Sequence, residues 1–191
     1  MTSRRPTRSA IGALAILAAS AVMGSCTNPV HDAEVNALGP EINGVPQGEY
    51  HRAGQPCAVC HSNDGPAKTT FTMAGTIFYG PNTNIGVAQT NVVMVDALGT
   101  SYTANTNCVG NFYVTPAEWN PAFPVKVELI GLGNTRGMVS HIGREASCSN
   151  CHKDPTYFDS PGHIHLTSSD TGYTTPPCPV NPELTPVGGH L

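Results

Sequence analysis

The stretch Phe123-Pro124-Val125-Lys126-Val127-Glu128-Leu129-Ile130 decides the fold class of this chain. Val125, Val127 and Leu129 alternate with Lys126 and Glu128, and a period of two puts these three apolar residues on one face of a β-strand. Three other runs are also typical of strands: Phe71 to Tyr79, Asn91 to Ala97, and Phe112 to Thr115. Turn-forming sequences separate the runs: Gly80-Pro81-Asn82, Leu98-Gly99-Thr100, and Cys108-Val109-Gly110-Asn111. We therefore predict a mainly β protein, built on a small antiparallel β-sandwich with little helix.

The composition agrees with this prediction and excludes one class of function. Gly and Pro together supply 37 of the 191 residues (20 and 17), and only 12% of residues are charged, which favours short strands and loops over long helices. The net charge is -4, and no cluster of Lys or Arg follows the first ten residues. A protein that binds nucleic acid normally carries a basic patch, so we exclude that function.

Two short motifs flank the predicted sandwich. They are Cys57-Ala58-Val59-Cys60-His61, the first motif, and Cys148-Ser149-Asn150-Cys151-His152, the second motif. Each matches the attachment signature of c-type haem, in which two thiols three positions apart add to the vinyl groups of the porphyrin. The histidine that follows is then available to the iron as the proximal ligand. We predict two covalently bound haem c groups.

Three other interpretations of the motifs remain open. The two cysteine pairs could form a four-cysteine zinc site, although this leaves both histidines unexplained and the pairs are far apart for a zinc ribbon. A thioredoxin-like redox pair would need a surrounding βαβ pattern, which the sequence lacks. Two local disulfides would be strained by such short loops. Haem attachment accounts for all six residues.

On these two motifs the chain resembles the small dihaem c-type cytochromes. The resemblance covers about ten residues and implies covalent haem, a His ligand below each iron, one-electron transfer, and redox partner proteins. The second axial ligand of each iron is open. Four His residues near the motifs are candidates, and Met138 and Met73 are alternatives. We expect six-coordinate iron at both sites, with at least two ligands drawn from His51, His141, His163 and His165.

The order of the short runs between the motifs also resembles that of a known β-sandwich family. The runs Ala74 to Phe78, Gly86 to Ala88, Val92 to Asp96, Gly110 to Tyr113 and Phe123 to Val127 resemble a carboxypeptidase regulatory-like or transthyretin-like sandwich. That resemblance implies a structural domain without catalytic residues. An even number of strands would bring the two haem segments together and an odd number would separate them, and we expect them to be close.

The N-terminus is typical of an export signal. Arg4, Arg5 and Arg8 precede an uncharged, mostly apolar stretch, 10–23, that is short for a membrane span. The sequence Val22-Met23-Gly24-Ser25-Cys26 resembles a bacterial lipobox, which implies a lipid anchor at Cys26; ordinary cleavage near Ser25 is the alternative. Both place the protein outside the cytoplasm, in the periplasm or on the outer membrane. We predict these divisions: signal peptide 1–25, linker 26–50, first haem segment 51–68, β-sandwich 69–131, second haem segment 132–178 and tail 179–191.

The remaining cysteines number three of the seven. With Cys26 lipidated, Cys108 and Cys178 are left as one candidate disulfide, which the sequence alone does not establish.

Three functions fit these features. The first is an electron carrier or relay outside the cytoplasm, which is not an enzyme. The second is a dihaem peroxidase-like reductase, which needs an open or displaceable iron ligand. The third is a structural or adhesion protein whose metal sites only hold its loops together. The oligomeric state cannot be inferred from these features.

Overall fold

The structure is a computed structural model that describes residues 28–41, 45 and 47–179. It is mainly β, as the sequence predicts. Its elements in chain order are two helices, α2 (Pro29–Ala37) and α3 (Cys57–Cys60), six strands and a 3-10 turn, Cys148–Asn150. The strands are β1 (Met73–Thr76), β2 (Asn91–Val95), β3 (Ser101–Asn105), β4 (Asn111–Val114), β5 (Lys126–Gly131) and β6 (Asn134–Gly137).

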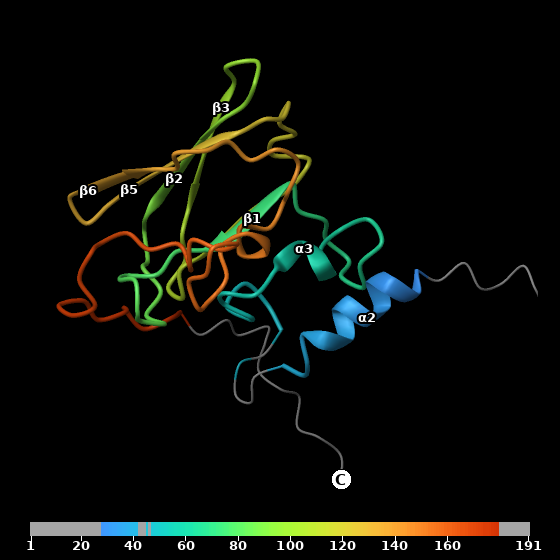
Figure 1. Ribbon diagram of the computed structural model, residues 1–191, viewed down its shortest axis with the longest axis horizontal. Helices are drawn as coiled ribbons and strands as arrows, with labels where there is room; N and C mark the ends of the chain where they lie inside the picture. Colours follow the sequence, from blue (N-terminus) through green and yellow to red (C-terminus); the bar gives the residue numbers. More distant parts are fainter. Residues whose placement is uncertain (1–27, 42–44, 46, 180–191) are drawn as a thin grey trace, which may run out of the picture.

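The strands form two antiparallel sheets. One contains β1 and β4, and the other has the order β3-β2-β5-β6. In Figure 1 the four-stranded sheet lies apart from α2, and β1 and α3 lie beside one another between them. The six strands of the described residues lie between the two Cys-x-x-Cys-His motifs in the sequence. A hydrogen bond between Ala58 and Ser147 shows that the chain returns near its starting point after the sandwich.

The core lies between the two sheets. Val92 and Met94 of β2 are fully buried, and Leu129 of β5 is almost so, whereas Lys126 and Glu128 are exposed. The alternation predicted for β5 is therefore confirmed. Leu166 joins this core from beyond the second motif. The segment 132–178, predicted to be the second haem segment, thus shares the core of the sandwich.

The segment 153–178, which follows the second motif, is held against the sandwich by a disulfide and by ring stacking. Cys108 and Cys178 are bonded, with their α-carbons 5.2 Å apart. Tyr173 stacks on Tyr79 with ring centres 5.2 Å apart. These contacts hold the segment that follows the second motif against the strands.

Several predicted bounds differ from the observed ones. β1 covers only part of the run from Phe71 to Tyr79, and β3 and β6 were not predicted at all. β6 extends the sheet past residue 131, the predicted end of the sandwich. Its residues are all exposed, so no apolar alternation marks it. α2 lies within the predicted linker, where Asn28 accepts a hydrogen bond from the His31 N–H and Pro29 is the first helical residue.

Other predictions fall outside the described residues. They concern the export signal, the lipidation of Cys26, and the tail from residue 180, which contains His190. Neither helix in the described part of the chain is long and apolar enough to cross a membrane.

Candidate functional site

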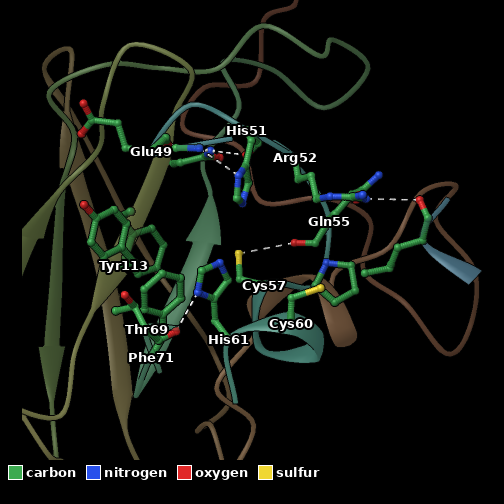
Figure 2. Close-up of a pocket in the computed structure, with 15 residues that line it drawn as sticks. Glu49, His51, Arg52, Gln55, Cys57, Cys60, His61, Thr69, Phe71 and Tyr113 are labelled. Carbon is green, nitrogen blue, oxygen red and sulfur yellow. Dashed lines mark hydrogen bonds between the residues drawn. The ribbon is translucent and has the colours of Figure 1, made fainter. Parts of the chain in front are cut away.

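The first motif folds as one short helical turn. α3 follows Pro56, and the His61 N–H donates a hydrogen bond of 2.9 Å to the Cys57 carbonyl oxygen. Residues three apart on such a turn lie on the same side of it. Cys57, Cys60 and His61 therefore border one cavity, as Figure 2 shows.

The His61 ring is held by one hydrogen bond and one ring stack. Its Nδ1 lies 2.8 Å from the carbonyl oxygen of Thr69. A carbonyl oxygen only accepts, so Nδ1 carries the proton and the lone pair of Nε2 is free. Phe71 stacks on the ring with centres 4.0 Å apart, and Tyr113 stacks on Phe71 at 4.9 Å. Histidines that bind metals commonly donate their other ring nitrogen to a carbonyl in this way.

The cavity beside the first motif has a volume of about 310 Å³. His51 lies across it from His61, with the two ring centres 5.9 Å apart and the planes tilted by 35°. The sulfur atoms of Cys57 and Cys60 lie to one side of the gap between the rings (Figure 2). Burial lowers the pKa of His51, with the carboxylate of Glu41 opposing this effect. A lower pKa favours the neutral ring, which is the form that binds metals.

The segment that carries His51 is fixed on both sides. The Arg52 guanidinium donates to the Glu41 carboxylate over 3.0 Å and to Gln55 over 2.7 Å. The Asn111 side chain, at the start of β4, donates to the His51 carbonyl oxygen over 3.0 Å. The backbone of His51 is thus tied to the sandwich and to the loop before the first motif.

The second motif repeats the local geometry of the first. The His152 N–H donates to the Cys148 carbonyl oxygen over 2.9 Å. The His152 Nδ1 lies 3.0 Å from the Gly162 carbonyl oxygen, so here too Nδ1 donates and the lone pair of Nε2 is free. At both motifs, therefore, Nδ1 of the histidine is used in a hydrogen bond and Nε2 is left free.

Ser160 closes the loop of the second motif. Its hydroxyl accepts hydrogen bonds from the N–H groups of Lys153 and Gly162, at 2.8 and 3.2 Å. It also lies 3.0 Å from the Cys151 carbonyl oxygen. This buried serine therefore sets the path of the chain that carries the acceptor for His152.

Two serines join the motifs directly. Ser147 is fully buried, and its hydroxyl accepts a hydrogen bond of 2.6 Å from the Ala58 N–H inside the first motif. The Ser149 hydroxyl donates to the Gln55 carbonyl oxygen over 3.0 Å. The first bond satisfies a donor at the start of α3 that has no partner within the helix. The two motifs are therefore in contact.

Gly75 of β1 makes room for this contact. A β-carbon at Gly75 would lie 2.9 Å from both Cβ and Sγ of Cys148, closer than real side-chain contacts allow. The backbone of Ala74 also pairs with Ser147. β1 is thus the platform against which the second motif packs.

The motif cysteines are free thiols in the structure. Burial raises the pKa of Cys57 to about 11 and that of Cys148 to about 12, and the Cys57 thiol adds to the effect at Cys148. The reactive cysteine of a thioredoxin-like pair has a lowered pKa. These raised values disfavour the redox-pair interpretation.

The other proposed axial ligands differ in their surroundings. Both ring nitrogens of His163 face oxygen acceptors, on Asp154 and on the Gly80 carbonyl, so neither is free to bind iron. The His165 Nδ1 lies 3.2 Å from the His163 carbonyl oxygen. His141 is exposed. Of the two methionines, Met73 is fully buried in the core, and Met138 is partly buried beside β5.

Sequence reasoning missed the residues that position the site. Ser147 lies 89 residues from Ala58, and Ser149 lies 94 residues from Gln55. Contacts at such separations leave no periodic signal in the sequence. The serines do stand immediately beside and inside the second motif, which was the only available hint.

No protein-family model, no curated protein and no solved structure matches this chain. Among the described residues, no group of three or more His, Cys, Asp or Glu side chains is arranged to hold a bare metal ion.

Proposed function

We propose that this chain is a dihaem c-type cytochrome that carries or relays electrons outside the cytoplasm. The observation that supports it best is the pair of Cys-x-x-Cys-His turns in direct contact, each with a histidine whose Nε2 lone pair is free. A bound haem would supply one-electron exchange between ferric and ferrous iron.

The donor set fits haem c at both motifs. Cys57 and Cys60 would form the thioether bonds at the first, with His61 as proximal ligand. Cys148, Cys151 and His152 would have these roles at the second. A haem iron takes four ligands from its porphyrin and needs only one or two from the protein. One imidazole per motif therefore meets the minimum requirement.

The contact between the motifs favours a relay over two independent carriers. The hydrogen bonds of Ser147 and Ser149 connect the two attachment loops without intervening residues. Two groups attached there would lie close together, so an electron received at one could pass to the other inside the protein. Redox partner proteins would then supply and remove it.

Export is part of the proposal. Haem c is attached outside the cytoplasm, and the predicted leader with a lipid at Cys26 would hold the protein at a membrane surface. If Cys26→Ala partitions into membranes as the natural chain does, the lipid is not the anchor.

Two alternatives remain in competition with the relay. A peroxidase-like reductase would bind small ligands at a five-coordinate iron, and a structural or adhesion protein would lack redox activity. We expect the purified protein to be coloured, to keep its haem on a denaturing gel stained for haem peroxidase activity, and to be low-spin when ferric. A colourless, zinc-containing protein would overturn the proposal, and a high-spin ferric protein would favour the reductase.

A further inference from the structure

We propose that His51 is the sixth ligand of the haem at the first motif, binding through Nε2. This inference rests on the proposed function, because it names a second axial ligand for a haem held by Cys57, Cys60 and His61.

The spacing of the two rings carries the inference. A metal–imidazole bond is about 2 Å long and each nitrogen lies about 1.2 Å from its ring centre, so two imidazoles on one iron have centres about 6 to 6.5 Å apart. The centres of His51 and His61 are 5.9 Å apart across the cavity. In Figure 2 the two rings face one another, with the motif sulfurs beside the gap. The cavity therefore already has the width of a bis-imidazole site.

The hydrogen bonds of the His51 ring leave Nε2 on the cavity side. The Gly48 N–H donates to Nδ1 over 3.2 Å, so Nε2 is the ring nitrogen left for a ligand bond. Because Nδ1 accepts there, the ring proton is on Nε2, which is the opposite tautomer to that of His61. Binding iron through Nε2 requires the proton to move to Nδ1, and the Gly48 N–H then loses this acceptor. His61 needs no such change, so His51 is the weaker of the two ligands.

The backbone around His51 is held in place, so only the imidazole ring is free to turn. Arg52 is anchored to Glu41 and Gln55, and the His51 carbonyl oxygen accepts from Asn111. The imidazole is therefore presented to the cavity from a fixed position, as a sixth ligand must be.

One other histidine competes for this role. His31 lies in α2, about two helical turns before Leu38, which caps that helix and lines the cavity. The His31 Nε2 is buried and has no hydrogen-bond partner among the described residues. No ring contact joins His31 to His61 in the described part of the chain. We therefore assign the role of sixth ligand to His51 and use His31→Ala to test the competing assignment.

The experiment compares the ferric spin state of full-length haem-loaded protein in three forms: natural, His51→Ala and His31→Ala. Low-temperature electron paramagnetic resonance and optical spectra give the high-spin fraction. The mass of the denatured protein gives the number of haems attached. For His51→Ala we expect about half of the haem to become high-spin, because one of two irons loses its sixth ligand. Added imidazole should restore the low-spin signal, and His31→Ala should match the natural protein.

Two results would overturn the assignment. One is a His51→Ala protein with both haems attached and an unchanged spin state, and the other is conversion by His31→Ala in place of His51→Ala. If His51→Ala does not fold, His51→Met keeps a ligand at this position. It should give the optical signature of a thioether ligand at one haem and raise the reduction potential of that haem; its absence would also overturn the assignment. A natural protein without covalent haem would instead refute the proposed function itself.

Discussion

The two Cys-x-x-Cys-His loops have the same local structure but different surroundings. In both, the histidine N–H bonds to the first cysteine's carbonyl and Nδ1 faces another carbonyl oxygen. His61 faces a second imidazole across a cavity lined by segments distant in the sequence, whereas the described residues place no aromatic or imidazole ring against His152. The five-residue motif, together with one backbone acceptor, thus sets the position of its own histidine. The tertiary fold determines the opposite side.

The largest expected effect comes from removing the cysteines of one loop. Replacing Cys57 and Cys60 by Ala should reduce the number of covalent haems from two to one, and so should replacing Cys148 and Cys151. Denatured mass spectrometry measures this directly. Only the first variant should also remove the low-spin signal that His51 and His61 would produce. Identical spectra for the two variants would show that the sites are equivalent and would contradict the comparison.

Ser147→Ala should affect both loops. It leaves the Ala58 N–H without its acceptor in a buried place, which costs about 1–3 kcal/mol of unfolding free energy. Thermal unfolding followed by far-ultraviolet circular dichroism gives the change, and redox titration should show altered potentials for both haems. Ser168→Ala, at an exposed serine, is the control. A change confined to one haem would mean that the serine does not couple the loops.

Ser160→Ala should disturb the second loop alone. It removes the acceptor for the N–H groups of Lys153 and Gly162, and we expect a loss of about 1–3 kcal/mol. Because Gly162 holds His152 through its carbonyl oxygen, the spectrum of the second haem should change. The His51-dependent low-spin signal of the first haem should not. Equal perturbation of both haems would contradict the separation of the two environments.

The smallest effect is expected for Phe71→Leu, at a residue that packs against the first loop. Phe71 stacks on His61 and on Tyr113, and such stacks contribute about 0.5–1.5 kcal/mol beyond the area they bury. The substitution should shift the electron paramagnetic resonance g-values of the first haem by changing the orientation of the His61 ring. Haem attachment should be unaffected. Unchanged g-values would mean that the Thr69 carbonyl alone orients the ring.

How far the sequence predicts this molecule depends on the range of the interactions. The strand around Val125 to Leu129 could be predicted because burial of one face requires apolar and polar residues to alternate along the sequence. β6 could not, since its exposed residues are held by backbone pairing with β5. The two motifs could be recognised in the sequence because each lies within five consecutive residues. The sequence could not show that His163 has no free ring nitrogen, because this depends on Asp154 and the Gly80 carbonyl oxygen, which occupy both nitrogens.

The signals for α2 were present but weak. Asn28 and Pro29 form a start signal for a helix, yet no residue of α2 is fully buried, so the apolar pattern that normally identifies a helix is faint. Unlike the start of α2, two features have no local signal in the sequence: the contact of Ser147 with Ala58 and the close approach of Gly75 to Cys148. They arise only when distant strands bring the loops together.

The most direct test of the central claim is the intact mass of the purified chain under denaturing conditions, after production in cells that attach haem c. We predict a mass that exceeds the processed polypeptide by two haem groups, with both lost when all four motif cysteines are replaced by Ala. A mass equal to that of the polypeptide alone, or with any lipid but no haem, would contradict the account.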